Sequence, residues 1–150
     1  MPDSPQHVWY RCADPVTEDD IRELESHLGV VFPQDFIELV LTRHGGRPEK
    51  DQVTVPGLRF AKVWSRLLLI PTPETANAPG SMLVFNRAVS QLLPAGVVAF
   101  VQLGGGDLLC FDYRKRKKNP SIVCWLHDTD EGPTIIPVTA TVTELLKLLH

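Results

Sequence analysis

Two apolar segments that flank a run of glycines place the strongest constraint on what this chain can fold into. Residues 97–103 read Val-Val-Ala-Phe-Val-Gln-Leu and residues 108–113 read Leu-Leu-Cys-Phe-Asp-Tyr, with Gly-Gly-Gly-Asp between them. β-Branched and aromatic side chains favour strands, and a short glycine-rich connection favours a hairpin. Since successive strand residues point to opposite faces, both faces of this hairpin are apolar and need cover. The sequence therefore predicts a β-hairpin in the middle of a sheet.

The length and composition suit one packed domain without a strong charge. The chain has 150 residues, of which 43% are hydrophobic. A chain of this size buries something like two-thirds of its unfolded surface. We expect a single domain over residues 17–150, preceded by an arm over residues 1–16 that holds three prolines. The formal net charge of −3 lacks the basic footprint that nucleic-acid-binding domains carry.

The start of the chain and its cysteines favour the cytoplasm. The first residues lack the basic start and the apolar run of a signal peptide. The longest apolar runs are far below the ~20 residues that a membrane span needs. The three cysteines, Cys12, Cys110 and Cys124, form no Cys-x-x-Cys pair. An odd number of such cysteines suits a reducing compartment, so we expect buried thiols rather than disulfides or a zinc site.

A pair of helices is predicted in the N-terminal third of the chain. Thr17 is suited to capping a helix that begins with acidic residues, has apolar residues at helical spacing and ends at Gly29. We expect its opposite face, which includes Glu25, to be polar and solvated. Pro33 suits the first position of a second helix, which the sequence His44-Gly-Gly ends.

Shorter patterns predict the remaining elements and complete the fold class. We expect two short strands, a short helix, two more strands and a C-terminal helix, at residues 53–55, 67–70, 85–93, 121–128, 134–138 and from 141 onward. Thr141 and Glu144 match a capping box at the start of that last helix. The predicted class is α+β, with a central antiparallel-rich sheet on which the N-terminal helix pair and the C-terminal helix pack.

The order of these motifs resembles the SUKH superfamily. The motifs are Ile-x-x-Leu-Glu-x-x-Leu-Gly at residues 21–29, Pro-x-Asp-Phe at residues 33–36, the Gly-Gly-Asp hairpin followed by Phe-Asp, a strand ending in His127-Asp128, and a final Leu-rich helix. The resemblance extends over nearly the whole chain, from about Val16 to His150. It implies the same α+β fold that the residue patterns predict.

The resemblance also implies a non-enzymatic binding domain. SUKH members include bacterial immunity proteins, which bind and neutralise a cognate toxin that is frequently a nuclease, and fungal regulators of cell-wall synthesis. An immunity protein is therefore the leading hypothesis, and an intracellular regulatory or scaffold interaction domain is the alternative. A third hypothesis, from a different class, is a small hydrolase that uses the segment around His127. Likeness of fold alone is a limited argument for function.

Two motifs invite a chemical interpretation. Gly104–Asp107 lacks the Gly-Lys-Ser/Thr ending and the following helix of a phosphate-binding loop, so a hairpin turn is favoured. The segment His127-Asp-Thr-Asp-Glu gathers a histidine and three carboxylates within five residues, yet no second motif supplies partners at ligand spacing. We therefore expect no cofactor, and no ordered divalent metal at His127, Asp128 and Asp130.

Charged segments supply the candidates for partner recognition. The five cations at residues 114–118 suit phosphate contacts, but no aromatic residues interleave for base stacking, so we do not expect nucleic acid as the partner. Carboxylates would attract a basic toxin and speed its association. The candidate partner-binding residues are Glu18, Asp19, Asp20, Glu25, Asp128, Asp130 and Glu131.

Overall fold

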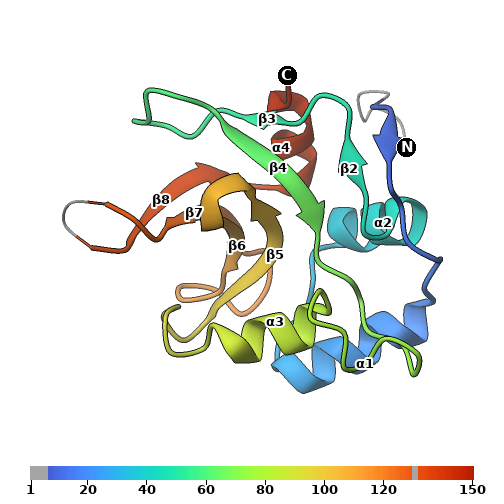
Figure 1. Ribbon diagram of the computed structural model, residues 1–150. Coiled ribbons are helices and arrows are strands. Elements are labelled where there is room, and N and C mark those ends of the chain that lie inside the picture. The colour runs from blue at the N-terminus through green and yellow to red at the C-terminus, as the bar shows by residue number, and fades with distance from the viewer. Residues whose placement is uncertain (1–6, 130–131) are drawn as a thin grey trace.

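The apolar segments on either side of the glycine run lie as neighbouring strands in the middle of a six-stranded sheet (Figure 1). The computed structural model describes residues 7–129 and 132–150. The sheet follows the order of the sequence, and all its neighbouring strands are antiparallel. Its strands are β3 (Gln52–Val53), β4 (Lys62–Leu67), β5 (Val97–Leu103), β6 (Leu108–Asp112), β7 (Ser121–Leu126) and β8 (Thr134–Thr139). The predicted antiparallel-rich central sheet is confirmed.

Four helices in the described residues complete the α+β fold. They are α1 (Glu18–Leu28), α2 (Gln34–Arg43), α3 (Met82–Ala88) and α4 (Val142–Leu148). α3 packs against β5 and α4 against β8, while α2 contacts both α1 and α4. Figure 1 shows a strongly curled sheet with α1 and α3 beneath it. None of these helices has the length and apolar character needed to cross a bilayer.

Three phenylalanine rings from different elements form the centre of the core. The rings of Phe100 on β5 and Phe111 on β6 are stacked with their centroids 4.0 Å apart. Phe36 of α2 meets both rings edge-on, at centroid distances of 5.6 and 5.0 Å. The three side chains are fully buried, which confirms the expected burial of Phe100 and Phe111. A β-bulge between Ala99 and Val101 makes Phe100 the extra residue of its strand.

The first and last helices begin at the predicted caps. The Thr17 hydroxyl accepts the N–H of Asp20, and the Asp20 carboxylate accepts the N–H of Thr17, which completes a capping box. The Thr141 hydroxyl accepts the N–H of Glu144 in the same way. The Glu144 carboxylate, however, accepts from the backbone of Ala140 rather than from Thr141. Thr141 therefore caps α4 as predicted, but the second hydrogen bond of a capping box, from the Thr141 N–H to the Glu144 carboxylate, is replaced by one from Ala140.

Side-chain hydrogen bonds attach the helix pair to the rest of the fold. Asp35 at the start of α2 accepts from the backbone N–H and the hydroxyl of Thr143 in α4, at 2.9 and 3.0 Å. The Tyr113 hydroxyl, just beyond β6, donates to the Val31 carbonyl in the connection between α1 and α2 at 2.8 Å. Hydrogen bonds thus supplement apolar packing at the joint between the two helices.

The third helix begins earlier and is shorter than the helix predicted at residues 85–93. Ser81 caps α3 by accepting the N–H of Val84, so the helix starts before the apolar spacing that suggested it. Beyond Ala88 the chain continues in turns. Leu92, which the prediction placed on a buried stripe, is exposed as a result.

The position of α3 is fixed by a side chain that replaces a strand. β4 pairs with β5 only as far as the pair Leu67–Val101. Closer to the start of β5, the Asn86 side chain accepts the N–H of Ala99 and donates to its carbonyl, at 2.8 and 2.9 Å. These are the two bonds that a neighbouring strand would make. Buried backbone groups of β5 thereby remain paired where β4 turns away.

The segment between the helix pair and α3 differs from the prediction. In place of the strand expected at residues 53–55, the structure has the two-residue strand β3. The strand expected at residues 67–70 lies earlier in the chain, because β4 ends at Leu67. A separate sheet pairs β1 (Trp9–Tyr10) with β2 (Arg47–Pro48), and two-residue strands of this kind carry no sequence periodicity. The Trp9 ring packs edge-on against buried Trp64 at 5.7 Å. The division into an arm and one domain stays a prediction.

The three cysteines differ in exposure. Cys110 on β6 and Cys124 on β7 are buried, as predicted, whereas Cys12 is exposed, so the expectation of a third buried thiol is wrong. Burial raises the pKa of the Cys124 thiol to about 12 and raises the pKa of Cys110 as well. Cys12 lies between β1 and α1, outside the sheet that encloses the other two.

Removing a ring from the aromatic cluster should destabilise the protein strongly. Phe100→Ala deletes a fully buried side chain and leaves a cavity, so we expect the free energy of unfolding to fall by about 3–5 kcal/mol. Chemical denaturation measures the change. Phe60→Ala is the control, because its side chain is 73% exposed and its removal should leave the midpoint nearly unchanged. An unmoved midpoint for Phe100→Ala would contradict the central position of β5.

Thiol reactivity should separate the cysteines. Only a thiolate attacks a disulfide reagent, and buried thiols with raised pKa values form it rarely. We expect one thiol per folded chain to react rapidly with Ellman's reagent at pH 8, and all three after unfolding. Cys12→Ser should abolish the rapid phase. Equal reactivity of the three thiols in the folded protein would show that β6 and β7 are open to solvent.

Candidate functional site

Asp107, which closes the glycine turn between β5 and β6, is the buried centre of a charge network. Its carboxylate lies 2.6 Å from Lys62 Nζ and 2.8 Å from His127 Nδ1. The backbone N–H of His127 also donates to Oδ1 of the same carboxylate, at 3.0 Å. Asp107 is only 4% exposed, whereas both partner side chains reach the surface. One carboxylate thus joins the start of β4, the β5–β6 turn and the end of β7.

The network holds Asp107 in its ionised form. Burial disfavours a charged carboxylate and would raise its pKa, but the hydrogen bonds from Lys62 and His127 together outweigh burial and hold the pKa of Asp107 below its ordinary value. An ionised carboxylate only accepts hydrogen bonds, so Nδ1 of His127 carries the hydrogen. In the neutral form of an imidazole with this tautomer, Nε2 is the acceptor.

Glycine is required at position 106 by this arrangement. The backbone of Gly106 has φ +95°, a conformation that strains other residues. A Cβ atom built there would lie 2.9 Å from Cε1 of His127. The imidazole therefore packs directly over the turn. The predicted hairpin turn at Gly104–Asp107 is confirmed, since it connects the paired strands β5 and β6.

The Asp107–His127 pair has the form of an oriented base but lacks a nucleophile among the described residues. In residues 7–129 and 132–150, no hydroxyl or thiol is hydrogen-bonded to the His127 ring. The same residues include no group of three side chains placed to hold a metal ion. Asp128 is exposed beside His127, and Asp130 lies outside the described residues. The expected absence of metal at these positions stays a prediction.

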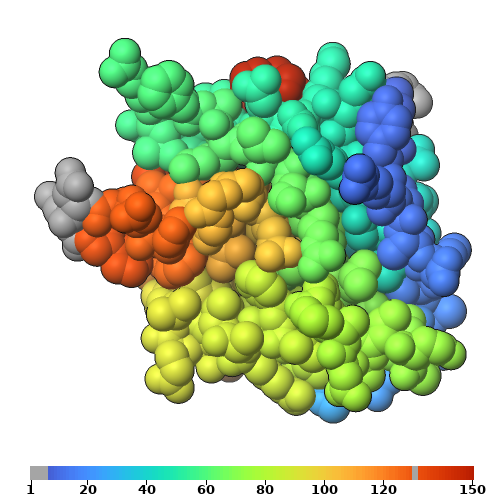
Figure 2. All heavy atoms as spheres, in the orientation of Figure 1, coloured from blue at the N-terminus to red at the C-terminus, as the bar shows by residue number. Residues whose placement is uncertain are grey.

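The charge network lies at one end of the strands of the sheet, on the side where three of the connections between strands are found. Because neighbouring strands alternate in direction, the β3–β4, β5–β6 and β7–β8 connections are all at the same end of the sheet. We call this end, made by residues 54–61, 104–107, 127–129 and 132–133, the turn edge. Figure 2 shows the β3–β4 connection projecting from the surface at the upper left.

An exposed aromatic residue is the most prominent side chain of the turn edge. Phe60 is 73% exposed, and the guanidinium carbon of Arg59 lies 5.3 Å from the centre of its ring. Val63 at the start of β4 is a further exposed apolar residue next to the turn edge, at 40% exposure. Lys62, between them, is held by Asp107. The turn edge therefore combines an exposed aromatic ring with a supporting backbone segment that the Lys62–Asp107 ion pair holds in place.

The acidic residues at the start of α1 have unequal roles. Glu18 and Asp19 are exposed, as the sequence predicts. Asp20 is partly buried, and its carboxylate accepts from the backbone N–H and the hydroxyl of Thr17. Asp20 therefore stabilises the start of the helix. Glu18 and Asp19 alone present carboxylates that make no hydrogen bond to other described residues.

Glu25 departs most clearly from the prediction of a solvated face. It is 8% exposed, and Oε2 accepts the N–H of Phe32 at 2.7 Å. Its other oxygen lies 3.0 Å from Arg22 Nη1. The reason is the left-handed turn at Gly29, which brings the chain back along the helix and places the Phe32 amide against this carboxylate. Glu25 closes the connection between α1 and α2 and is not a solvated residue.

The structure does not bring the two acidic segments together. Figure 1 shows the start of α1 at the right of the molecule and the β7–β8 connection at the far left. Asp128 is exposed in that connection. Asp130 and Glu131, the other candidates of the segment, lie outside the described residues. The exposed and described carboxylates of the two segments, Glu18, Asp19 and Asp128, thus lie on two separate surfaces.

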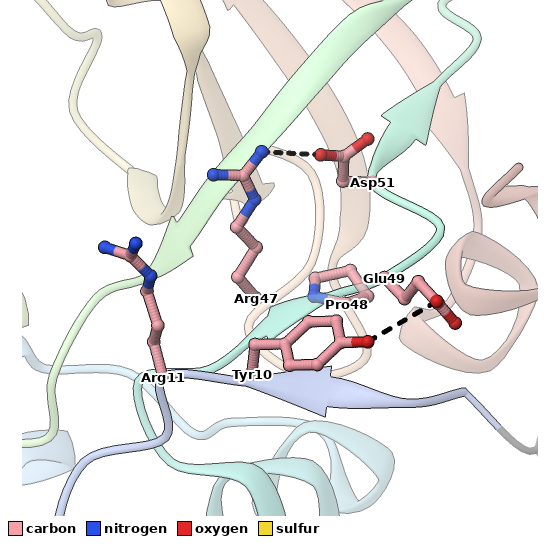
Figure 3. A pocket seen from close by; sticks show the side chains of 6 residues that line it. All are labelled: Tyr10, Arg11, Arg47, Pro48, Glu49 and Asp51. Carbon is pink, nitrogen blue, oxygen red and sulfur yellow. Dashed lines mark hydrogen bonds and ion pairs between the residues drawn. The ribbon is translucent and has the colours of Figure 1, made fainter.

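A shallow pocket lies beside the two-stranded sheet (Figure 3). Its volume is about 310 Å³, and it is lined by Tyr10, Arg11, Arg47, Pro48, Glu49 and Asp51. Arg47 pairs with Asp51 at 2.7 Å, and the Tyr10 hydroxyl donates to Glu49 at 3.4 Å. Two arginines are balanced by two carboxylates. The lining therefore has no net charge that would select an anion or a cation.

Sequence reasoning missed the partners of Asp107 and the exposure of Phe60. One signal for the network was present in the hairpin pattern. Pairing Leu108 with Trp125, as the structure does, places the residue before β6 near the residues that end β7. That register would have brought Asp107 and His127 together. Nothing in the sequence indicates that Lys62 completes the network.

The comparisons with known proteins identify a family. The model of the SMI1/KNR4 family (SUKH-1) matches residues 15–148, nearly the whole chain. Neither the curated proteins nor the solved structures give a significant match. The matched range includes the helix pair, the six-stranded sheet and α4.

Removing the charge of Asp107 should lower stability in a pH-dependent way. Asp107→Asn keeps the shape of the side chain, and we expect a loss of about 1.5–3 kcal/mol in the free energy of unfolding at pH 7, the range for hydrogen bonds to a charged group. The full difference between variant and wild type should be seen above about pH 4, where an unfolded aspartate is ionised. The difference should vanish as the pH falls through the lowered pKa of the folded state.

Urea unfolding at pH 7 and at pH 2.5 measures this difference. Asp128→Asn is the matched control, because it removes an exposed carboxylate close to the same histidine. It should change the midpoint little at either pH. An equal loss for Asp107→Asn at both pH values would mean that the carboxylate charge is not the source of the stability.

Proposed function

The chain belongs to the SMI1/KNR4 family (SUKH-1), and from this membership we propose that it is a non-enzymatic protein-binding domain that acts as an immunity protein against a cognate toxin. The match over residues 15–148 is the observation that carries the proposal. SUKH immunity proteins share one scaffold and differ in their binding surfaces. On this proposal the protein acts in the cytoplasm, where it meets a toxin that is frequently a nuclease.

The turn edge offers the anchor that a protein interface needs. Most of the binding energy of an interface comes from a few residues, and aromatic side chains are prominent among them. Phe60 is such a side chain, and Arg59 lies over its ring. Val63, exposed next to Gly104 of the β5–β6 turn, adds apolar surface. Because Asp107 fixes Lys62, the base of the projecting connection is ordered before a partner arrives. Preorganisation of this kind lowers the cost of binding.

Exposed carboxylates supply the attraction for a basic partner. Glu18 and Asp19 at the start of α1 and Asp128 on the turn edge are solvent-exposed. The overall charge of −3 has the sign that attracts a basic nuclease domain. Asp130 and Glu131 extend the acidic segment in the sequence and remain in the proposed surface on that ground. Glu25 and Asp20 are left out of it because both are engaged within the fold.

A regulatory or scaffold interaction domain is the second candidate. It is favoured by the family itself, since the resemblance described above includes fungal regulators of cell-wall synthesis. The two candidates share the interaction surface and differ in the partner. A neighbouring gene for a large secreted protein with a C-terminal toxin domain supports immunity, whereas an isolated locus supports regulation. Protection of cells that express the toxin is the direct test.

Kinetics with the neighbouring toxin domain should separate steering from anchoring. The double variant Glu18→Gln/Asp19→Asn should slow association about fourfold at low salt, as Coulomb's law gives for two charges at roughly 10 Å in water. The effect should fade at high salt. Phe60→Ala should mainly speed dissociation, because it removes the proposed anchor.

Surface plasmon resonance at two salt concentrations measures both rates. Glu38→Gln/Glu74→Gln is the matched control, since it removes two exposed carboxylates elsewhere and should change association less. If all variants bound tightly with unchanged rates, the immunity proposal would stand, but the binding site would lie elsewhere on the protein. Absence of binding to the neighbouring toxin and of protection would defeat the immunity proposal and favour regulation.

A further inference from the structure

The turn between β6 and β7 concentrates positive charge at the end of the sheet opposite the turn edge. Residues 114–118 are Arg-Lys-Arg-Lys-Lys. Arg114 is neutralised by Asp112, with Nε and Nη2 each 2.9 Å from a carboxylate oxygen. Among the described residues, no carboxylate lies within ion-pair distance of the four cations that follow. An uncompensated charge of about four is therefore held in one short turn.

A pocket opens between this turn and the junction of β8 with α4. It has a volume of about 250 Å³ and is lined by Asp112, Lys115, Arg116, Asn119, Ser121 and Ala140. The lining differs from that of the pocket in Figure 3, because its one carboxylate is already clamped by Arg114. Two cations, an amide and a hydroxyl remain as hydrogen-bond donors.

The backbone of the turn is shaped to form this pocket. Asn119 has φ +52°, and asparagine is among the residues that adopt the left-handed conformation most readily. Buried Pro120 follows and anchors the end of the turn. Ser121 then begins β7 in register with Asp112 at the end of β6. The reversal at Asn119 brings residues from both sides of the turn to one pocket.

We propose that this basic-turn pocket binds a phosphate group, carried by a nucleotide or, contrary to the expectation from the sequence, by a nucleic-acid backbone. Lys115 and Arg116 provide charge, and Ser121 and Asn119 provide neutral donors, which is the set of groups that phosphate oxygens accept from. A terminal phosphate carries up to two negative charges on a compact centre, so it offsets more of the turn's charge than one carboxylate, and a nucleic-acid backbone reaches the same total with successive phosphodiesters of one charge each. No aromatic side chain lines the pocket, so the base makes no stacking contact there.

An acidic protein segment is the competing ligand, and the geometry favours it less. The planar fork of Arg114, which could bind either a carboxylate or a phosphate, is already occupied by Asp112. The lining itself offers the ammonium of Lys115, the guanidinium of Arg116 and two neutral donors around a small concave space, which suits a compact anion better than an extended acidic segment. The proposal is independent of the proposed partner at the turn edge, because the two surfaces lie at opposite ends of the sheet.

Titrations followed by ¹⁵N–¹H NMR test the proposal at low salt. The probes are inorganic phosphate, adenosine 5′-monophosphate and a ten-residue oligothymidylate. Saturable shifts at the amides of Lys115, Arg116, Asn119 and Ser121 are expected. Lys115→Gln/Arg116→Gln should weaken binding about tenfold or more, because it removes both charged contacts of the pocket. Lys117→Gln/Lys118→Gln, with the same change of charge outside the lining, should weaken it less than about threefold.

The outcomes distinguish the source of the phosphate and the competing ligand. Tighter binding of the oligothymidylate than of the mononucleotide, with a steep salt dependence, assigns the pocket to a nucleic-acid backbone. Equal binding of the mononucleotide and the oligomer assigns it to a nucleotide. Equal losses in the two double variants, or shifts that never saturate, would overturn the pocket in favour of a diffuse positive surface. Stronger binding of an octaglutamate peptide than of phosphate would overturn it in favour of a protein ligand.

Discussion

The buried carboxylate of Asp107 connects parts of the chain that the backbone alone leaves independent. β4 reaches it through Lys62 and β7 through His127, while the carboxylate itself belongs to the turn after β5. Removing a charge from water is costly, and the cost is met here by three hydrogen bonds to one side chain. Phe60, on the projecting β3–β4 connection, lies only two residues before Lys62. The same charge that organises the sheet therefore also positions the proposed anchor.

Local patterns predicted the elements whose causes are local. The hairpin around Gly104–Asp107 and the caps at Thr17 and Thr141 follow from residue types at adjacent positions, and the structure has them there. Glu25 and Asp107 were less predictable, because their partners are reached only after the chain folds back. The α3 start was missed because one capping serine follows a segment rich in proline and glycine. Two-residue strands such as β1 have no pattern to find.

The proposed activities are distributed over surfaces that do not overlap. The turn edge has an aromatic side chain and Asp128, whereas the opposite end has the basic turn and its pocket. A ligand at one end leaves the other accessible. The core between them is closely packed, since the rings of Phe36, Phe100 and Phe111 contact one another across a helix and two strands. One scaffold can in this way vary each surface without disturbing the packing that supports both.

The aromatic cluster also determines when the N-terminal helices can be buried during translation. Phe36 leaves the ribosome with the helix pair, but the rings that bury it belong to β5 and β6. At 5–20 residues per second, the chain from Phe36 to Phe100 takes roughly 3–13 s to synthesise. The sheet then extends strand by strand in the order of translation, because each strand pairs with the next one made. During the interval the apolar face of the nascent helices is uncovered, and it is the segment of this protein on which a ribosome-associated chaperone would act.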